Sequence, residues 1–209
     1  MKSLYIFRRD YRLIDNRGLI EACKKSDKVL CTFIFTPEQI KNNEYFSNAS
    51  FQFLLESLKE LDEELGKLKT RLVLVIEDNI KGLKKIREKF KYDEIYFNED
   101  YTPYAIRRDN EIEKFCNKEK IKCNKVHDYL LAPMGTFLKK DKTYYGVYGA
   151  FRKITKNVKI DKVEEYKFSE KNFTDIDNIN KFDDLEKYYK KNDKLLINGG
   201  RKRALKILD

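Results

Sequence analysis

The strongest constraint on the fold is a set of short apolar runs, each followed by a segment with helical spacing. Residues 3–7 and 28–35 are continuous aromatic, aliphatic and β-branched runs, without the polar alternation that a half-exposed strand would show. Further short runs rich in such residues lie at 72–76, 94–98 and 122–126. Strands of this kind belong to a parallel sheet that helices cover on both faces.

The segments between these runs carry apolar residues at steps of three and four, as amphipathic helices do. The expected helices lie at 17–25, 47–69, 80–90 and 104–120, with 38–46 left as a loop. Asp15 or Asn16 can cap the first helix, and Ser47 or Ser50 the second. Connections this short require parallel crossovers, so we predict a five-stranded, Rossmann-like α/β domain over residues 1–130.

The first predicted strand ends in a dense group of charged residues, which includes Arg8, Asp10 and Arg12. The carboxyl ends of strands are where open α/β sheets bind ligands and dock partners. Charged groups are costly to bury unpaired, so these three must meet water, one another or another surface. Pairing between Arg8 and Asp10 is one such arrangement, and contact with another surface is a second.

The charge of the chain is uneven. The formal net charge is +10, from 45 Lys and Arg against 35 Asp and Glu, and residues 131–209 account for +7 of it. Such an excess attracts polyanions such as DNA. The alternative is that lysines scattered along a Lys-, Asn- and Ile-rich chain form an ordinary solvated surface, since no short window is purely basic.

The sequence offers little independent chemistry. Four cysteines without C-x-x-C spacing indicate buried free thiols, and the single histidine, His127, is expected to be structural, so no metal site is predicted. The adjacent acids Glu99 and Asp100 are expected to cap the following helix or to pair with Arg107 and Arg108, not to act as acid and base. No apolar run has the length of a signal or a membrane span, which predicts a soluble, intracellular protein.

Beyond residue 130 the periodicity fades. Residues 131–197 are predicted to form a long, partly irregular interdomain linker, and 198–209 to open a further helical domain.

Several stretches resemble, in order, the motifs of the DNA photolyase and cryptochrome family. Residues 7–16 read F-R-R-D-Y-R-L-I-D-N, residues 53–62 read F-L-L-E-S-L-K-E-L-D, and residues 98–109 read N-E-D-Y-T-P-Y-A-I-R-R-D. Weaker matches are H-D-Y-L-L at 127–131, V-Y-G-A-F at 147–151 and the Gly-Gly opening of a helix at 199–200. The resemblance covers nearly the whole chain but only the amino-terminal portion of the family.

The resemblance implies an antenna domain without a catalytic residue. In the family, flavin adenine dinucleotide (FAD), the lesion pocket and the tryptophans that relay electrons belong to the helical domain, and this chain has no tryptophan. We therefore expect the amino-terminal part of a truncated or split deoxyribodipyrimidine photolyase, a light-driven DNA repair enzyme. Its partners would be a separately encoded helical domain that holds the FAD, and damaged DNA through the complete assembly. In the family the signature at residues 7–16 lies near the contact between the two domains, so the resemblance implies that Arg8, Asp10 and Arg12 form a docking cluster for the helical domain, with pairing between Arg8 and Asp10 as the alternative. The alternative is a non-catalytic ligand-binding or interaction module.

The family resemblance also implies a site for an antenna chromophore, which in different members is a folate, a deazaflavin or flavin mononucleotide (FMN). Folate binders commonly carry Asn-Glu where this chain has Tyr104-Ala105, and deazaflavin or FMN binders often carry an arginine where it has Ser50. Both departures leave an altered or lost pocket as an alternative. The expected cofactor-binding residues lie at the carboxyl ends of the strands and are Phe35, Ser50, Asn98, Glu99, Asp100 and Tyr101.

Overall fold

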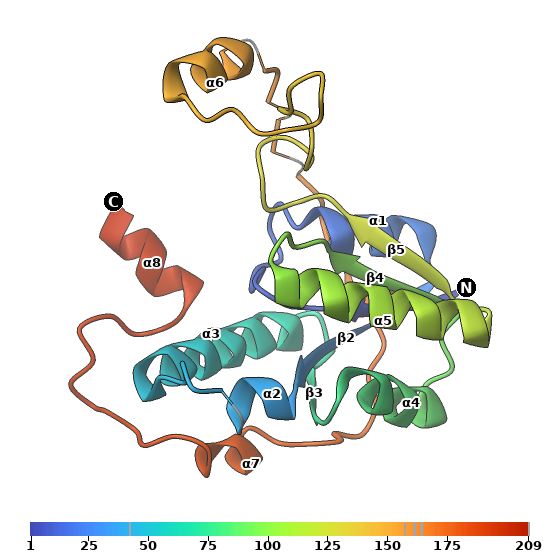
Figure 1. The fold of residues 1–209 in the computed structure, drawn as a ribbon. Coiled ribbons are helices and arrows are strands. Elements are labelled where there is room, and N and C mark those ends of the chain that lie inside the picture. Colours follow the sequence, from blue (N-terminus) through green and yellow to red (C-terminus); the bar gives the residue numbers. More distant parts are fainter. Residues whose placement is uncertain (42, 157, 161, 164, 209) are drawn as a thin grey trace.

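A parallel five-stranded sheet forms the centre of the molecule (Figure 1). The computed structural model describes residues 1–208 except 42, 157, 161 and 164. The strands lie side by side in the order β3-β2-β1-β4-β5, so the first strand is central, as its sequence predicts. Their bounds are β1 Lys2–Ile6, β2 Lys28–Phe35, β3 Val73–Ile76, β4 Glu94–Asn98 and β5 Lys122–Val126. The predicted α/β fold class is confirmed.

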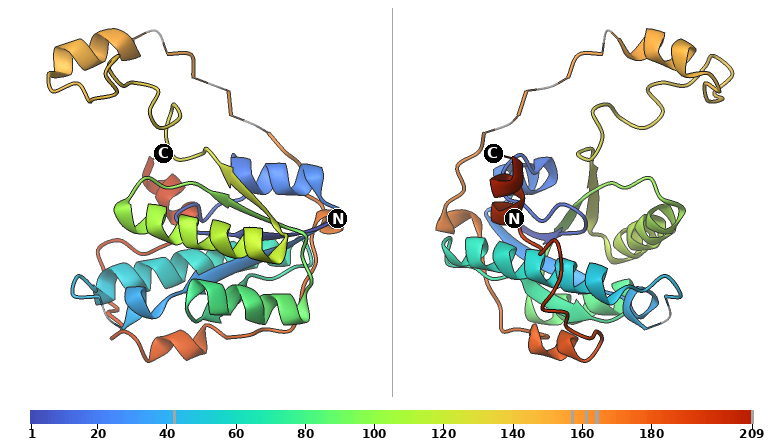
Figure 2. Two further views of the ribbon diagram at one scale, coloured as in Figure 1. Left: turned by 45° about the vertical axis from the view of Figure 1, so that its right-hand side comes forward. Right: turned by 90° about the vertical axis from the view of Figure 1, so that its left-hand side faces the viewer.

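Helices cover both faces of the sheet, because alternate side chains of each strand point to opposite sides. Tyr5 and Phe7 belong to one core cluster and Leu4 and Ile6 to the other. The first cluster packs beneath α1 and α3, and the second beneath α4 and α5 (Figure 2). The bounds of these helices are α1 Arg17–Lys25, α3 Asn48–Gly66, α4 Asn79–Lys89 and α5 Pro103–Glu119.

Side-chain caps set the starts of three helices. Asn16 accepts from the Leu19 amide, Ser47 from the Ser50 amide and Thr102 from the Ala105 amide. The predicted loop at 38–46 needs one correction, since a single helical turn, α2 (Pro37–Ile40), begins it. Pro37 presets the first helical φ, and the Gln39 side chain accepts from the Thr36 amide at 3.1 Å, a local signal that periodicity cannot detect.

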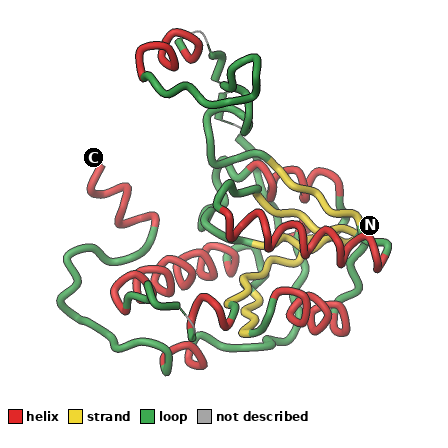
Figure 3. Tube along the Cα trace, viewed as in Figure 1, coloured by secondary structure: helices red, strands yellow, loops and turns green. Residues whose placement is uncertain are grey.

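Residues 130–156 form an arm that stands away from the sheet (Figure 3). The arm contains α6 (Tyr148–Thr155), none of whose residues is buried. An edge-on contact between Phe137 and Phe151, with ring centroids 5.9 Å apart, links the two sides of the arm. Within the described residues, no helix combines the length and the apolar character needed to cross a membrane.

The chain then returns along the sheet, in a stretch we call the return segment (residues 166–200). Phe173 is 3% exposed and forms a bridge with Val29, while Asn180 bridges Leu74 and its side chain accepts from the Ile76 amide at 2.9 Å. Short helical turns at Glu170–Asn172 and α7 (Asp183–Glu186) interrupt it, and α8 (Arg201–Leu208) follows. Part of the core therefore comes from residues beyond 130, within the stretch predicted as a linker.

Truncating Phe173 tests whether the return segment belongs to the domain. Phe173→Ala should lower the free energy of unfolding by about 3–5 kcal/mol, because it empties a buried aromatic site. Urea unfolding followed by circular dichroism measures the change. The matched control is Tyr144→Ala, on the exposed arm, which should change stability by no more than about 0.5 kcal/mol. Similar small effects of both substitutions would show that the return segment contributes little to the folded domain.

Candidate functional site

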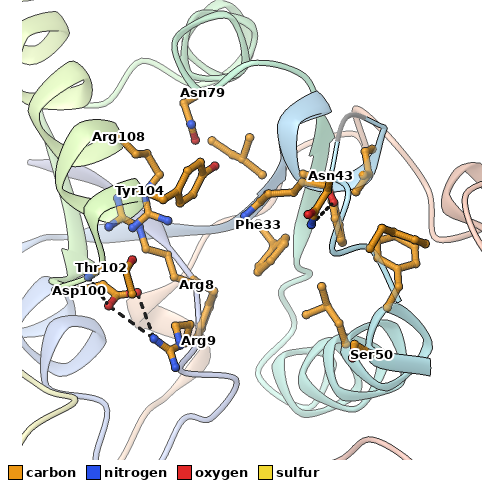
Figure 4. A pocket seen from close by; sticks show the side chains of 18 of the residues that line it. Arg8, Arg9, Phe33, Asn43, Ser50, Asn79, Asp100, Thr102, Tyr104 and Arg108 are labelled. Atoms are coloured by element: carbon orange, nitrogen blue, oxygen red, sulfur yellow. Dashed lines mark hydrogen bonds and ion pairs between the residues drawn. The ribbon is translucent and has the colours of Figure 1, made fainter. Parts of the chain in front are cut away.

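A cavity of about 380 Å³ lies at the carboxyl ends of β1, β2 and β4, and we call it the strand-end cavity. Its walls come from these strand ends, from α2 and the loop after it, and from the first turns of α3 and α5 (Figure 4). Ligands bind at this edge of open parallel sheets because the loops there diverge. The cavity has two walls of different character.

One wall is aromatic. Phe33 and Phe35 from β2 contact each other with ring centroids 4.6 Å apart, and Phe35 contacts Phe51 of α3 at 5.9 Å. Phe46, in the loop before α3, lies 5.3 Å from Phe51. Rings in these tilted and edge-on arrangements present a firm surface on which a planar ring system can stack.

The opposite wall is polar. The half-exposed guanidinium of Arg9 lies 3.4 Å from a carboxylate oxygen of Asp100, whose side chain is 7% exposed. Asp100 also accepts from the Tyr101 amide at 2.7 Å, which fixes its direction at the end of β4. The Tyr104 hydroxyl is within 3.2 Å of the Thr36 hydroxyl, across the mouth between α5 and α2. Donors and acceptors thus face the aromatic side chains across the cavity.

Two buried arginines of the polar wall share one carboxylate. Arg8 Nη1 donates to Asp109 Oδ1 at 2.6 Å, and Arg108 Nε donates to the same oxygen at 3.0 Å. Arg8 also stacks on Phe97, with its guanidinium carbon 3.7 Å from the ring centroid. Burial, together with the like charge of Arg108, lowers the pKa of Arg8 to about 10. Among the described residues, Nη2 of both arginines is buried without a hydrogen-bond partner.

Beneath the cavity lies a fully buried polar cluster, the Tyr5 network, made of Tyr5, Asp10, Asn16 and Asn98. Tyr5 donates its hydroxyl to Asp10, and Asn98 Nδ2 lies 2.7 Å from Asp10 and 2.9 Å from the side-chain oxygen of Asn16. The Arg8 amide donates to the other Asp10 oxygen at 2.8 Å. Burial, then the nearby Asp10 charge, raises the pKa of Tyr5 well above its ordinary value. The network therefore joins β1, β4 and the start of α1.

The structure brings three of the six expected cofactor-binding residues together: Phe35, Ser50 and Asp100 line the cavity. The other three, Asn98, Glu99 and Tyr101, are not among its lining residues. Asn98 belongs to the Tyr5 network, Glu99 lies 3.6 Å from His127, and the Tyr101 side chain is half exposed outside the cavity.

The three residues predicted to dock a partner make contacts within the chain. Arg8 and Asp10 are 6% and 1% exposed, and each has the partners described above. Arg12 Nη2 lies 2.8 Å from Asp128, and 30% of its side chain is exposed. The alternative pairing of Arg8 with Asp10 occurs only through the Arg8 amide, since the guanidinium pairs with Asp109. Docking by this group stays a prediction.

The expected pairing of Glu99 and Asp100 with Arg107 and Arg108 is wrong. Asp100 pairs with Arg9, while Arg108 turns back to its neighbour Asp109 and Arg107 reaches Glu38 at 3.8 Å. Both arginines lie one turn inside α5, beyond the strand end. The expectation that these acids cap the following helix is also wrong, because the cap of α5 is Thr102, and Asp100 accepts from the Tyr101 amide ahead of the helix.

Four residues of the site escaped the sequence reasoning: Phe33, Tyr104, Arg108 and Asp109. Phe33 looks like any core residue of a buried strand. The others stand in the P-Y-A-I-R-R-D stretch that opens α5, where a step of four residues from Tyr104 to Arg108 puts both on one helix face. That spacing, set against Arg8 just after the end of β1, was the available signal. No grouping of three or more metal-ligating side chains occurs among the described residues.

Comparison with known proteins decides the family. The family model described as DNA photolyase matches residues 3–171. The chain belongs to the DNA photolyase family. The photolyase-type motifs at the end of β1, in α3 and at the start of α5 are those that build the strand-end cavity and the Tyr5 network.

The relatives are longer than this photolyase-family chain. A deoxyribodipyrimidine photo-lyase of Synechococcus sp. is 29% identical over 150 residues, which are 72% of this chain and 31% of the relative. The archaeal photolyase of Sulfolobus tokodaii, whose crystal structure is described as having two FAD molecules and implying a novel light-harvesting cofactor, is 36% identical. It superposes with a TM-score of 0.86 over 100% of this chain and 46% of its own. A bacterial class III photolyase from Agrobacterium tumefaciens, 22% identical with a TM-score of 0.81, shares the fold.

The shared carboxylate gives a test of the arginine pair. Asp109→Asn keeps the side-chain shape but leaves two buried cations without a counter-charge, which should cost about 3–5 kcal/mol of unfolding free energy. Arg8→Met should cost less by at least ~2 kcal/mol, because Asp109 keeps Arg108 and the repulsion between the cations disappears. Urea unfolding of both variants measures the difference. Equal losses would mean that Arg8 and Arg108 do not depend on one carboxylate.

Proposed function

We propose that this chain is the antenna part of a light-driven DNA photolyase: it binds a planar light-absorbing cofactor in the strand-end cavity and docks a flavin-binding helical domain. The observation that supports this most is the two-walled cavity at the carboxyl ends of β1, β2 and β4. A bound chromophore would absorb light there and pass the excitation to the flavin of the helical domain. The helical domain would supply the catalytic flavin and the contact with damaged DNA.

The residues present fit such a ring. The volume of about 380 Å³ is at the small end of the range for ligand pockets, which suits one ring system with its tail outside. Phe33, Phe35 and Phe51 would hold the apolar part by stacking. The unpartnered Nη2 groups of Arg8 and Arg108, both lining residues, mark the wall where carbonyl oxygens of a ring edge are expected.

Among the three antenna classes, we favour a flavin-type ring. The Sulfolobus tokodaii photolyase, with its two FAD molecules and proposed light-harvesting cofactor, is 36% identical and covers the whole of this chain. Folate binders of the family carry Asn-Glu at the start of the helix where this chain has Tyr104-Ala105. Ser50, in place of the arginine common in deazaflavin and FMN binders, removes one cation from the rim, and Arg9 on the opposite wall is the cation that remains available for the tail.

Docking of the helical domain belongs to the same proposal. The half-exposed Arg9 and the partly exposed Arg12 are the outward members of the charged group at the end of β1. Arg8 and Asp10 would act indirectly, by holding this loop in place. The chain spans less than half of the structural relatives it matches and about a third of the first curated ones. In this proposal a separately encoded helical domain supplies the flavin-binding part.

Titration with FMN tests the chromophore site. The flavin absorbance and fluorescence should change on binding, and Phe35→Ala should weaken binding at least about fivefold, because it removes a stacking surface worth about 1 kcal/mol or more. Asp100→Arg should weaken FMN binding more than Phe35→Ala does, since this substitution removes the partner of Arg9 and adds bulk to the polar wall.

The control is Lys84→Gln, an exposed change on α4 away from the cavity, which should leave the affinity unchanged. The same titration with a folate and a deazaflavin separates the three classes. Binding of FMN that both cavity substitutions leave intact would place the site elsewhere, and tight binding of the folate alone would overturn the preference for a flavin-type ring.

A further inference from the structure

One stripe of side chains on α3 binds backbone N–H groups of residues 190–202 of the same chain. Asn48, Gln52, Glu56 and Glu60 follow one another at steps of four, and we call them the α3 ladder. Each accepts a backbone N–H: from Lys190 at 2.9 Å, Asn192 at 2.8 Å, Gly199 at 2.7 Å and Lys202 at 2.9 Å, in that order. We call the bound stretch, residues 188–202, the exit segment, since it leads into α8.

The rungs of the ladder support one another. Gln52 is 2% exposed, and its amide nitrogen donates to the Asn192 carbonyl at 3.1 Å and to the next rung, Glu56, at 3.0 Å. Burial raises the pKa of Glu56, but bonds from Gln52 and the Gly199 amide lower it, and the net pKa lies below its ordinary value. The bonded form is therefore the ionised one, which accepts most strongly from backbone amides.

Two glycines bring the exit segment into contact with α3. A Cβ on Gly199 would lie 2.1 Å from the Phe53 carbonyl oxygen, closer than any side chain allows. Gly200 has φ +116°, where side chains are strained, and its amide donates to Ser57 at 3.1 Å. Glu60 then accepts from Lys202, in the first turn of α8, where a carboxylate favours the helix dipole. The ladder thus determines both the register of the exit segment and the direction of α8.

The neighbouring stripe of the same helix lines the strand-end cavity. Ser50, Phe51 and Leu54 of α3 are lining residues, and Phe51 lies about 100° around the helix from Gln52, its neighbour in the sequence. Phe51 also contacts Tyr189 of the exit segment, with ring centroids 5.6 Å apart. Gln52 and Tyr189 are not among the residues that line the cavity. A single ring therefore both lines the cavity and contacts the exit segment.

We propose that the α3 ladder holds the exit segment as one cooperative unit, and that Phe51 and Tyr189 couple this unit to the filling of the strand-end cavity. A chromophore against Phe51 then stabilises the bound exit segment, and the bound segment strengthens chromophore binding by the same factor. The ladder residues become positioning residues, which set the direction of α8 and of anything attached to it relative to the chromophore. The coupling rests on the proposed function, and the cooperative ladder does not.

Amide hydrogen exchange of the whole chain, read by mass spectrometry, tests the ladder without ligand. Gln52→Ala should speed exchange at Gly199 and Lys202 as well as at Asn192, roughly fivefold or more, because loss of one rung opens the unit. Glu64→Gln, a change of charge on α3 outside the ladder, should leave these amides unchanged. Faster exchange at Asn192 alone would show independent local bonds and overturn the cooperative unit.

The coupling is tested by adding FMN. Saturating FMN should slow exchange of residues 188–202 in the wild-type chain by roughly fivefold or more, and Tyr189→Ala should abolish this protection. Gln52→Ala should weaken FMN binding by a similar factor, although Gln52 does not line the cavity. FMN that binds without protecting the exit segment, or with unchanged affinity in Gln52→Ala, overturns the coupling. A wild-type chain that binds neither FMN nor a folate nor a deazaflavin overturns the proposed function and the coupling together, and leaves the ladder to the ligand-free measurement.

Discussion

The site depends on the buried carboxylate of Asp10. A carboxylate with 1% exposure is stable only where donors surround it, and Asp10 has the Tyr5 hydroxyl, the Arg8 amide and the side chains of Asn16 and Asn98. These donors come from β1, the start of α1 and the end of β4. The chain can leave β1 in only one direction if all of them are to be satisfied. In that direction the side chain of Arg8 becomes part of the polar wall of the cavity, and Arg9 lies at its rim.

The polar wall of the cavity is therefore held in place by the elements around it. The Tyr5 network positions the end of β1, and the side chain of Asn98 accepts from the Gly18 amide at 3.0 Å, which holds α1 close to β4. A Cβ at Gly18 would lie 2.4 Å from that Asn98 oxygen, so glycine is required there. Arg8 and Arg108 both donate to Asp109 of α5. Each polar group of the wall is held by another element of the fold, so the site is rigid on that side, whereas the opposite side consists of stacked rings.

Sequence reasoning succeeded where the pattern is local. Continuous apolar runs and helical periodicity located the five strands and the long helices to within a few residues, and Asn16 and Ser47 marked two helix starts. Phe35, Ser50 and Asp100 were expected at the cavity because the resemblance to the family implies a pocket at this edge of the sheet. The direction of a side chain at a strand end could not be predicted. Asn98 points under the sheet edge and Tyr101 points outward, and their order in the sequence does not reveal this difference. The contribution of Phe173 to the core was also hidden, because an isolated aromatic in a charged stretch gives no periodic signal.

The return segment has a consequence for synthesis on the ribosome. It bridges Val29, near the start of β2, and Leu74 on β3, the strand at the border of the sheet, so it covers backbone groups that another strand could otherwise pair with. These bridging residues, Phe173 and Asn180, emerge roughly 50 residues after the end of β5, several seconds later at ordinary rates of translation. During that interval the five strands can be complete while one border of the sheet is still open to other chains. The residues that bind α3, from Lys190 to Lys202, emerge later still, so the border of the sheet can close before the chain reaches α3.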